Sequence, residues 1–309
     1  MELILEHDGS YPGFLCATAE YFNHCLGNTA GKPSHNKQPS PLRYGNQTRP
    51  PGNWSTDTTP PNSSQPAPRP IIKPAGQLCG LFEDCIAIST DPERAAAFLH
   101  RLSKRAGSTA TEQIRQAFGC DQTQIDGLHL HSALAGTLLR LWQDGPAGWQ
   151  RLDDPAVAAA NKAYTRASRE MHLFQGITRF AELSDQSMYA PIRPACDILD
   201  FLAPHFGERF AAQRWILHDS GRNIAILHCP QRGLLRTEGF ELAEGNVDTL
   251  HSSSEKHIQS LWQQYFNSVA IQSRINPRCQ RSFLPLKHRH KLPEFAPTID
   301  SQAKPDTQY

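Results

Sequence analysis

The sequence predicts an α+β fold in which a small antiparallel sheet of hairpins packs with several helices, interrupted by a disordered Pro-rich insertion. Apolar residues recur at helical spacing in several stretches, most clearly over 258–269. Two other runs, 214–218 and 223–229, resemble strands and flank Asp219-Ser220-Gly221, where the glycine can supply the positive φ of a tight turn. Helices and hairpins in one chain favour the α+β class.

A long polar segment interrupts these patterns. Residues 28–77 are dominated by Pro, Ser, Thr, Asn and Gln and carry almost no aliphatic side chains. Such a segment cannot bury enough apolar surface to offset its chain entropy, so we expect it to be disordered. The predicted organisation is an N-terminal strand and helix (1–27), the insertion (28–77), the remainder of one α+β domain (78–295, with a motif core at 154–229) and a disordered tail (296–309).

The first half of the ordered chain is predicted to be mostly helical. Asp91 and Pro92 mark a helix start, because Asp caps free N–H groups and proline lacks one at the first helical position. His129 and His131 lie two positions apart on a predicted helix and therefore point to different sides, which argues against a metal site. The predicted elements are a strand at 2–7, a helix over 14–25, a strand at 81–89, and helices from Pro92, over 111–118 and over 127–142.

The second half begins with an Ala-rich helix and then changes to alternating patterns. Asp197 is predicted to cap a short helix and Ser254 a long amphipathic one, whose Trp262, Tyr265 and Phe266 are expected in the core. The predicted elements are a helix over 155–171, strands at 174–182 and 188–192 joined by a short turn, a short helix at 198–202, a turn carrying 205–210, the hairpin at 214–229, a strand at 238–244 and the helix from Ser254.

Composition excludes several classes of protein. The net charge of +1 gives no global field for a polyanion, so a nucleic-acid surface must be a local patch. The eight cysteines form no C-x-x-C pair, and no phosphate-binding, dinucleotide, hydrolase or zinc-protease motif is present, so we expect no cofactor and no metal. The N-terminus lacks a basic signal region and no apolar run approaches membrane length, which predicts a cytoplasmic protein without a membrane partner.

Ionisable residues gather among aromatic residues in the motif core. A carboxylate beside a histidine is the minimum set for general acid-base catalysis, and nearby arginines suit a phosphate. The candidate catalytic residues are Glu170, His172, His205 and Asp219, and the nearby candidate phosphate contacts are Arg179, Arg209 and Arg222. The alternative is that these carboxylates and arginines form structural ion pairs while the histidines are satisfied core groups.

A basic segment follows the long amphipathic helix. Between Arg274 and Lys291 it holds six Lys or Arg residues and two histidines, interleaved with Phe283 and without an acidic residue. This composition is typical of a surface that follows a phosphate backbone, although a plain solvated segment has the same composition. The candidate nucleic-acid contacts here are Arg274, Arg281, Lys287 and Arg289.

Several motifs together carry a family resemblance. They are HDGSYPGFL, REMHLFQGITRFAEL, MYAPIRP, HFGERF, WILHDSGR, LWQQYF, R-x-N-P and LP-x-K-H-R-x-K-LPEF. In this order they resemble an uncharacterised family of DNA repair or DNA metabolism proteins associated with a radical-SAM partner, whose domain is similar to one fused to certain uracil-DNA glycosylases. The chain departs from the pattern at His7, where an aromatic residue is expected, and in the insertion.

The resemblance implies a role beside DNA but carries no catalytic residues over to this chain. Three hypotheses follow. The first is a DNA repair or DNA metabolism factor that binds DNA and acts with a radical-SAM protein. The second is a nucleic-acid or nucleotide hydrolase that uses the Glu/His/Arg cluster, and the third is a protein-interaction scaffold.

Overall fold

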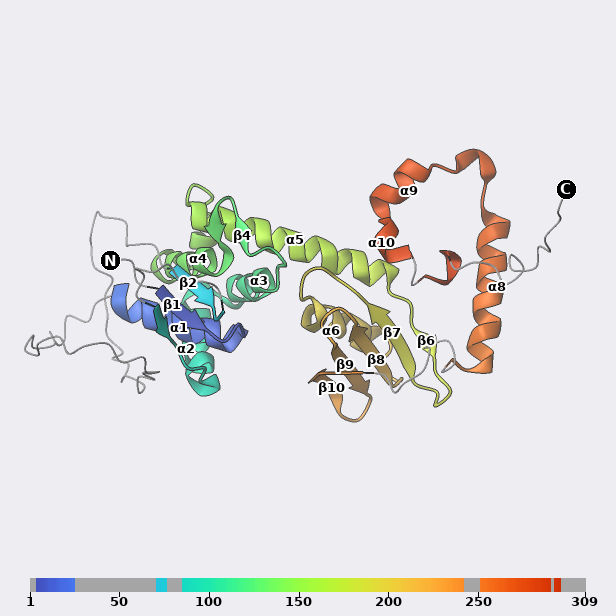
Figure 1. Cartoon of the computed structure of the whole chain (residues 1–309), viewed down its shortest axis with the longest axis horizontal. Coiled ribbons are helices and arrows are strands. Elements are labelled where there is room, and N and C mark those ends of the chain that lie inside the picture. Colours follow the sequence, from blue (N-terminus) through green and yellow to red (C-terminus); the bar gives the residue numbers. More distant parts are fainter. Residues whose placement is uncertain (1–3, 26–70, 77–84, 242–250, 290–291, 296–309) are drawn as a thin grey trace, which may run out of the picture. The chain divides into compact units, whose positions relative to one another are not determined.

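The computed structural model describes residues 4–25, 71–76, 85–241, 251–289 and 292–295 (Figure 1). The chain divides into two compact units, Met1–Ser168 and Arg169–Tyr309, and helix α5 (Pro155–Ile177) runs through the boundary. Most of the predicted insertion and the whole predicted tail lie outside the described residues.

The chain has an α+β fold, as predicted. In the first unit the strands are β1 (Ile4–His7), β2 (Ile71–Pro74) and β3 (Cys85–Ala87), in the order β2-β1-β3. Both pairings are parallel, with Ile4 opposite Ile71 and Cys85, so this sheet contains no hairpin. The prediction of disorder through residue 77 is therefore wrong for Ile71–Pro74, whose Ile72 is fully buried.

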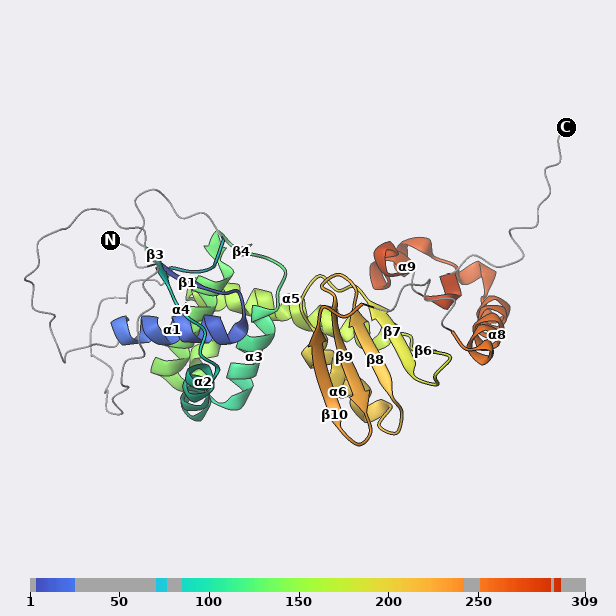
Figure 2. The same ribbon diagram turned by 60° about the horizontal axis from the view of Figure 1, so that its bottom comes forward.

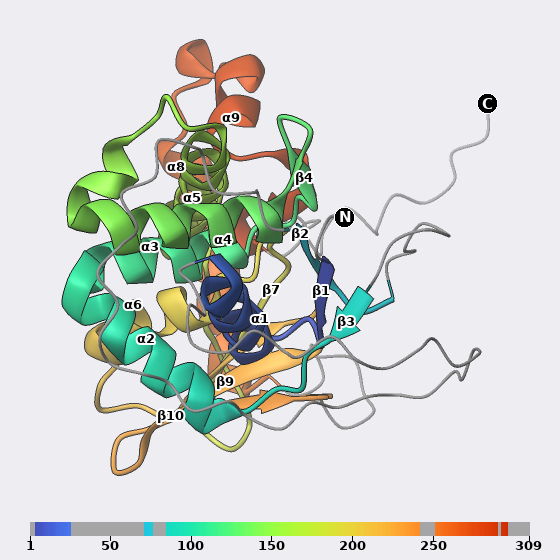
Figure 3. The same ribbon diagram turned by 90° about the vertical axis from the view of Figure 1, so that its left-hand side faces the viewer.

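Helices and one short hairpin form the rest of the first unit, and the helices gather on one side of the parallel sheet (Figure 3). Phe14, Leu102, Leu134 and Leu138 are fully buried members of its core. The elements are α1 (Tyr11–Cys25), α2 (Pro92–Ala106), α3 (Ser108–Phe118), the short hairpin β4 (Gln124–Ile125) and β5 (Leu128–His129), α4 (Leu130–Asp144), η1 (Gly145–Gln150) and the start of α5.

The helix starts follow from side-chain caps. Asp91 accepts hydrogen bonds from the N–H groups of Glu93 and Arg94 at the start of α2, as predicted. At the start of α1, Asp8 Oδ1 accepts from the Ser10 N–H (2.9 Å) and hydroxyl (2.7 Å), and Ser10 Oγ accepts from the Gly13 N–H (3.0 Å). The HDGSYPGFL motif is therefore a helix-capping device.

Gly13 makes this device possible because a side chain there has no room. A Cβ at position 13 would lie 2.1 Å from Asp8 Oδ1 and 2.7 Å from Thr90 Oγ1. We expect Gly13→Ala to lower the free energy of unfolding by about 1–3 kcal/mol, measured by urea titration. Gly176→Ala is the matched control, because a methyl group there would meet nothing within 4 Å and alanine favours a helix. Equal stability of the Gly13 variant and the wild type would contradict the steric argument.

The second unit contains a five-stranded sheet in the order β10-β9-β8-β7-β6 (Figure 2). Its strands are β6 (Ala181–Glu182), β7 (Met188–Ile192), β8 (Trp215–Asp219), β9 (Ile224–Cys229) and β10 (Gly233–Glu238). The two predicted hairpins, β6-β7 and β8-β9, are confirmed as antiparallel pairs. Strands β7 and β8 pair in parallel, which requires a crossover connection between them.

Helix α6 (Leu199–Arg209) supplies that crossover and packs on the sheet. The Phe180 ring meets Phe206 of this helix at 5.0 Å and Trp215 of β8 at 5.8 Å, both edge to face. Trp215 is 1 % exposed. Aromatic rings packed in this way contribute both buried area and specific geometry to the core.

Several predicted boundaries are wrong. Helix α5 continues to Ile177, so of the predicted strand 174–182 only Ala181–Glu182 is extended. Asp197 does not cap α6 but pairs with Arg236 (3.1 Å). His129 lies in β5 rather than in a helix, and Pro204 lies inside α6. Strand β10 ends at Glu238, where the predicted strand 238–244 begins. Residues 242–244 lie outside the described residues.

The C-terminal segment is helical. It comprises α8 (Ser253–Val269), η2 (Gln272–Arg274), α9 (Pro277–Phe283), α10 (Leu286–Arg289) and η3 (Pro293–Phe295). Ser252 rather than Ser254 caps α8, by accepting from the Glu255 N–H (3.0 Å). The predicted burial of the apolar stripe of α8 is wrong: Trp262 is 41 %, Tyr265 57 % and Phe266 37 % exposed. Among the described residues, no helix combines the length and apolar character needed to cross a membrane.

Candidate nucleic-acid interface

Glu170, a predicted catalytic carboxylate, is engaged by the backbone of a loop. It lies near the C-terminal end of α5, and its Oε1 and Oε2 accept hydrogen bonds from the N–H groups of Ala195 (2.8 Å) and Cys196 (2.7 Å). These residues belong to the connection between β7 and α6, which we call the 193–198 loop. Because both oxygens are engaged, Glu170 anchors this loop.

Asp219 and Arg222 hold the same loop from the other side. Asp219 is 1 % exposed, and its Oδ2 accepts from Arg222 Nη1 (2.7 Å) while its Oδ1 accepts from the Gly221 N–H (2.9 Å). Arg222 also donates to the carbonyl oxygens of Pro194 (3.2 Å) and Ala195. Arg222, a predicted phosphate contact, therefore directs its guanidinium into the fold.

The two predicted catalytic histidines have separate surroundings. The Nδ1 atom of His172 lies 3.1 Å from the Gln175 side-chain oxygen on the exposed face of α5. The His205 ring packs against Phe206 of α6 at 5.0 Å. In the parts of the chain that the structure describes, no hydrogen bond joins Glu170, His172, His205 or Asp219 to another of these four groups. The acid-base assignment therefore stays a prediction without supporting geometry.

A small cleft lies where α5, β7 and α10 meet in the second unit. Its apolar floor includes Phe174, whose ring meets His288 at 5.0 Å edge to face. The cleft offers about 20 Å³, room for about one water molecule, so it does not enclose a small-molecule substrate. Its full lining is Phe174, Ile177, Thr178, Arg179, Pro191, Ile192, Arg193, Lys287, His288 and Leu292.

Three cations line this cleft. Arg179 donates to the Gly176 carbonyl (2.9 Å) and pairs with Glu294 Oε1 (3.2 Å), whose side chain is only 8 % exposed. Lys287 and Arg193 are exposed and form no ion pair within the described part of the chain. Three cations and one carboxylate leave two positive charges beside an apolar floor, an arrangement suited to a phosphate.

Arg193 was not among the site residues predicted from the sequence. It lies directly after β7 in the MYAPIRP motif, where it is the only charged residue. A Cβ at position 221 would lie 3.3 Å from Arg193 Cγ, so Gly221 leaves room for the arginine stem to pass. A charge placed immediately after a buried strand was the signal available in the sequence.

The predicted basic segment adds further charges, but not all of its members are free. Arg274, Arg278 and Arg281 are exposed and form no ion pair with a described carboxylate. Arg289 instead donates to the Leu284 carbonyl (3.2 Å), and its guanidinium lies over the Phe295 ring at 4.8 Å. His290 and Lys291 lie outside the described residues.

We use the name cationic surface for the exposed cations of the C-terminal segment that pair with no described carboxylate, together with Arg193, which lines the cleft beside Lys287. The five residues are Arg193, Arg274, Arg278, Arg281 and Lys287. The structure does not bring Arg209 to this set: it lies at the end of α6, with its guanidinium 5.6 Å from the Phe210 ring. Of the seven predicted nucleic-acid contacts, Arg274, Arg281 and Lys287 belong to the cationic surface and Arg179 lines the adjoining cleft.

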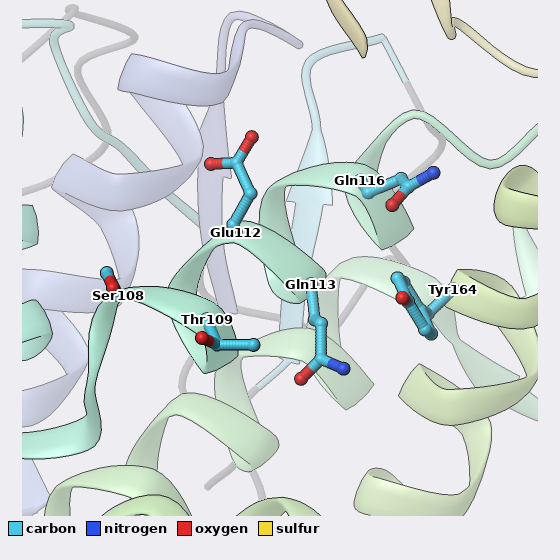
Figure 4. A pocket seen from close by; sticks show the side chains of 6 residues that line it. All are labelled: Ser108, Thr109, Glu112, Gln113, Gln116 and Tyr164. Atoms are coloured by element: carbon cyan, nitrogen blue, oxygen red, sulfur yellow. The ribbon is translucent and has the colours of Figure 1, made fainter. Parts of the chain in front are cut away.

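A wider hollow of about 440 Å³ lies on α3 in the first unit. In Figure 4 the side chains of Gln113 and Gln116 lie toward Tyr164, whereas Glu112 points away from them. The lining residues are Ser108, Thr109, Glu112, Gln113, Gln116 and Tyr164. With one carboxylate and no cation in this lining, the hollow does not suit a phosphate.

The fold and the site define an α+β protein whose C-terminal segment carries exposed cations without carboxylate partners among the described residues. The chain belongs to DUF4130, a family of domains of unknown function, whose model matches residues 129–294, more than half of the sequence. The match covers the whole five-stranded sheet, α8 and the cationic surface. No curated protein and no solved structure matches the chain.

Proposed function

We propose that this protein binds DNA through the cationic surface and the adjoining cleft. The observation that supports the proposal is the set of five exposed cations without a described carboxylate partner, in a chain whose net charge is only +1. Elsewhere in the described chain many arginines are paired with carboxylates, as in Arg94 with Glu20 and Arg140 with Asp154. Binding to a phosphate backbone requires cations that are not already neutralised by carboxylates.

The biological role in the proposal follows the family resemblance. We propose a DNA repair or DNA metabolism factor in which this chain holds DNA and a radical-SAM protein performs the chemistry. Co-expression with a candidate radical-SAM protein, followed by co-purification in high salt, tests that partnership. Failure to co-purify, with DNA binding retained, would remove the partner and keep the DNA-binding proposal.

A double variant tests the phosphate contacts. We expect Arg193→Ala/Lys287→Ala to bind DNA more weakly and to reduce the slope of log affinity against log salt by about 0.7–0.9 for each lost phosphate contact. Fluorescence anisotropy with labelled oligonucleotides over a range of salt concentrations measures both quantities. Neither side chain has an ion-pair partner to lose among the described residues, so the fold should persist. Arg289 is avoided because it holds the Leu284 carbonyl.

The matched control removes two exposed cations that lie outside the cationic surface, Lys104 of α2 and Arg232 of the β9-β10 turn. Lys104→Ala/Arg232→Ala changes the net charge by the same amount and should keep the wild-type slope. Equal losses in both double variants would mean that only net charge matters. Absence of DNA binding by the wild-type chain at low salt would refute the proposed function.

A further inference from the structure

Helix α8 exposes an aromatic face. Its apolar stripe was expected in the core, yet no residue of α8 is buried. The Trp262 and Tyr265 rings lie 5.7 Å apart with an angle of 34° between their planes, and the Tyr265 side chain is 57 % exposed. Large aromatic side chains left open to solvent on a common face mark an interaction surface more often than isolated exposed residues do.

Glu294 of η3 connects this aromatic face to the cleft that Arg179 lines. Trp262 Nε1 donates to Glu294 Oε2 (3.4 Å), and the other oxygen of the same carboxylate holds Arg179 at 3.2 Å. One buried carboxylate thus joins the indole to a cation of the cleft. A ligand that contacts both groups therefore needs apolar planar parts and anionic parts close together.

A second link repeats this pairing of aromatic and cationic groups. The Phe295 ring lies 6.0 Å from the Phe266 ring of α8 and 4.8 Å from the Arg289 guanidinium. Phe283 of α9 is 76 % exposed and lies two positions after Arg281. The C-terminal segment therefore carries aromatic rings and cations close to one another, as a ligand made of bases and phosphates requires.

We propose that Trp262 and Tyr265 form a stacking platform for unpaired bases, so that the chain prefers single-stranded to double-stranded DNA. The inference rests on the proposed function and specifies its substrate. Aromatic faces bind unstacked bases of any sequence, while neighbouring cations hold the phosphates. In a duplex each base is already stacked on its neighbours, so its face is not offered to the protein.

Tyr265 provides the sharpest test, because its ring is exposed and its hydroxyl forms no hydrogen bond within the described chain. We expect Tyr265→Leu to bind single-stranded DNA about tenfold more weakly, the loss typical of one stacked base, with duplex affinity unchanged. Tyr265→Phe keeps the ring and should bind as the wild type does. Ile258→Ala is the matched control: Ile258 is 56 % exposed on α8 and has no ring. It should leave both affinities unchanged.

Anisotropy titrations of these variants with a mixed-sequence single strand and with its duplex separate the outcomes. If Tyr265→Leu binds the single strand like the wild type while Arg193→Ala/Lys287→Ala binds weakly, the stacking platform is refuted and the phosphate surface stands. If the wild-type chain binds neither DNA, the proposed function fails first. If Tyr265→Leu and Ile258→Ala both dissociate a dimer in sedimentation, with DNA affinity unchanged, α8 joins two copies of the chain and the inference is overturned.

Discussion

Replacing Asp219 with alanine should destabilise the second unit by about 3 kcal/mol or more. The substitution leaves Arg222 without its carboxylate partner, and removing one member of a buried ion pair typically costs about 3–5 kcal/mol. It also removes the acceptor for the Gly221 N–H, and it loosens Arg222, which holds the carbonyl oxygens of the 193–198 loop. Because the Arg222 side chain is 30 % exposed, we expect the lower end of that range. Urea unfolding measures the loss.

Asp197→Ala, in the 193–198 loop itself, is the matched control. Asp197 also pairs with an arginine, Arg236, but its side chain is 36 % exposed, and exposed pairs contribute about 0–1 kcal/mol. The Asp219 variant should therefore lose several times more stability than the Asp197 variant. Similar losses in the two variants would show that the buried pair does not hold the loop. Asp219→Asn, which keeps the shape without the charge, should fall between the wild type and Asp219→Ala.

The sequence reveals local structure well because local signals depend on neighbouring residues. Asp91 and Pro92 begin α2 as predicted, and a turn follows Asp219 as predicted, but its positive φ belongs to Asn223 (φ 55°) and not to Gly221. The predicted end of α5 was wrong because the local signal there is ambiguous. Phe174, 3 % exposed, continues the buried helical stripe of Ala163 and Ala167, but over a few residues an apolar run fits a strand equally well.

Long-range pairing was not predictable. Ile71–Pro74 pairs with β1, from which more than sixty residues separate it, and its proline-rich surroundings have the composition of a disordered segment. The predicted burial of the apolar stripe of α8 was wrong for a different reason. An amphipathic pattern shows that one face avoids water but does not name what covers that face.

The candidate site was only partly predictable, because sequence proximity is a poor guide to side-chain direction. Glu170 and His172 lie two positions apart on α5, a spacing that places side chains on different sides of a helix. One then anchors the 193–198 loop and the other faces solvent. The basic segment was easier to predict from the sequence. Because it contains no acidic residue, most of its cations find no carboxylate partner nearby.

Acid should destabilise the first unit through a buried pair of histidines. His7 Nδ1 accepts from the Gly9 N–H (3.1 Å), so His7 Nε2 carries the proton and donates to His131 Nδ1 at 3.0 Å. Burial lowers the pKa of His7 from 6.5 to about 4 and that of His131 to about 3. Phe14 and Phe118 pack around both rings. These surroundings also suit an aromatic residue, which the family resemblance implies at position 7.

The direction of the pH effect follows from these lowered values. The unfolded chain takes up protons below pH 6.5, whereas the folded chain resists protonation of both rings until pH 4 or lower. The stability that the neutral pair confers is therefore complete above pH 6.5 and is lost as the pH falls from 6.5 toward 4 and then 3. At pH 5 the loss is about 2 kcal/mol for each histidine, from about 1.36 kcal/mol for each pKa unit.

Replacing both rings isolates this contribution from the other titrating groups. His7→Phe/His131→Phe exchanges both hydrogen-bonding partners for apolar rings of similar shape, which is far less costly than removing one partner. The wild-type free energy of unfolding should fall between pH 7 and pH 5 by about 4 kcal/mol more than that of the double variant. His100→Phe, at an exposed position of α2, should keep the wild-type difference. If the double variant loses as much stability on acidification as the wild type, the histidines are not the acid-sensitive groups, and carboxylates paired in the first unit, such as Glu20 with Arg94, become responsible.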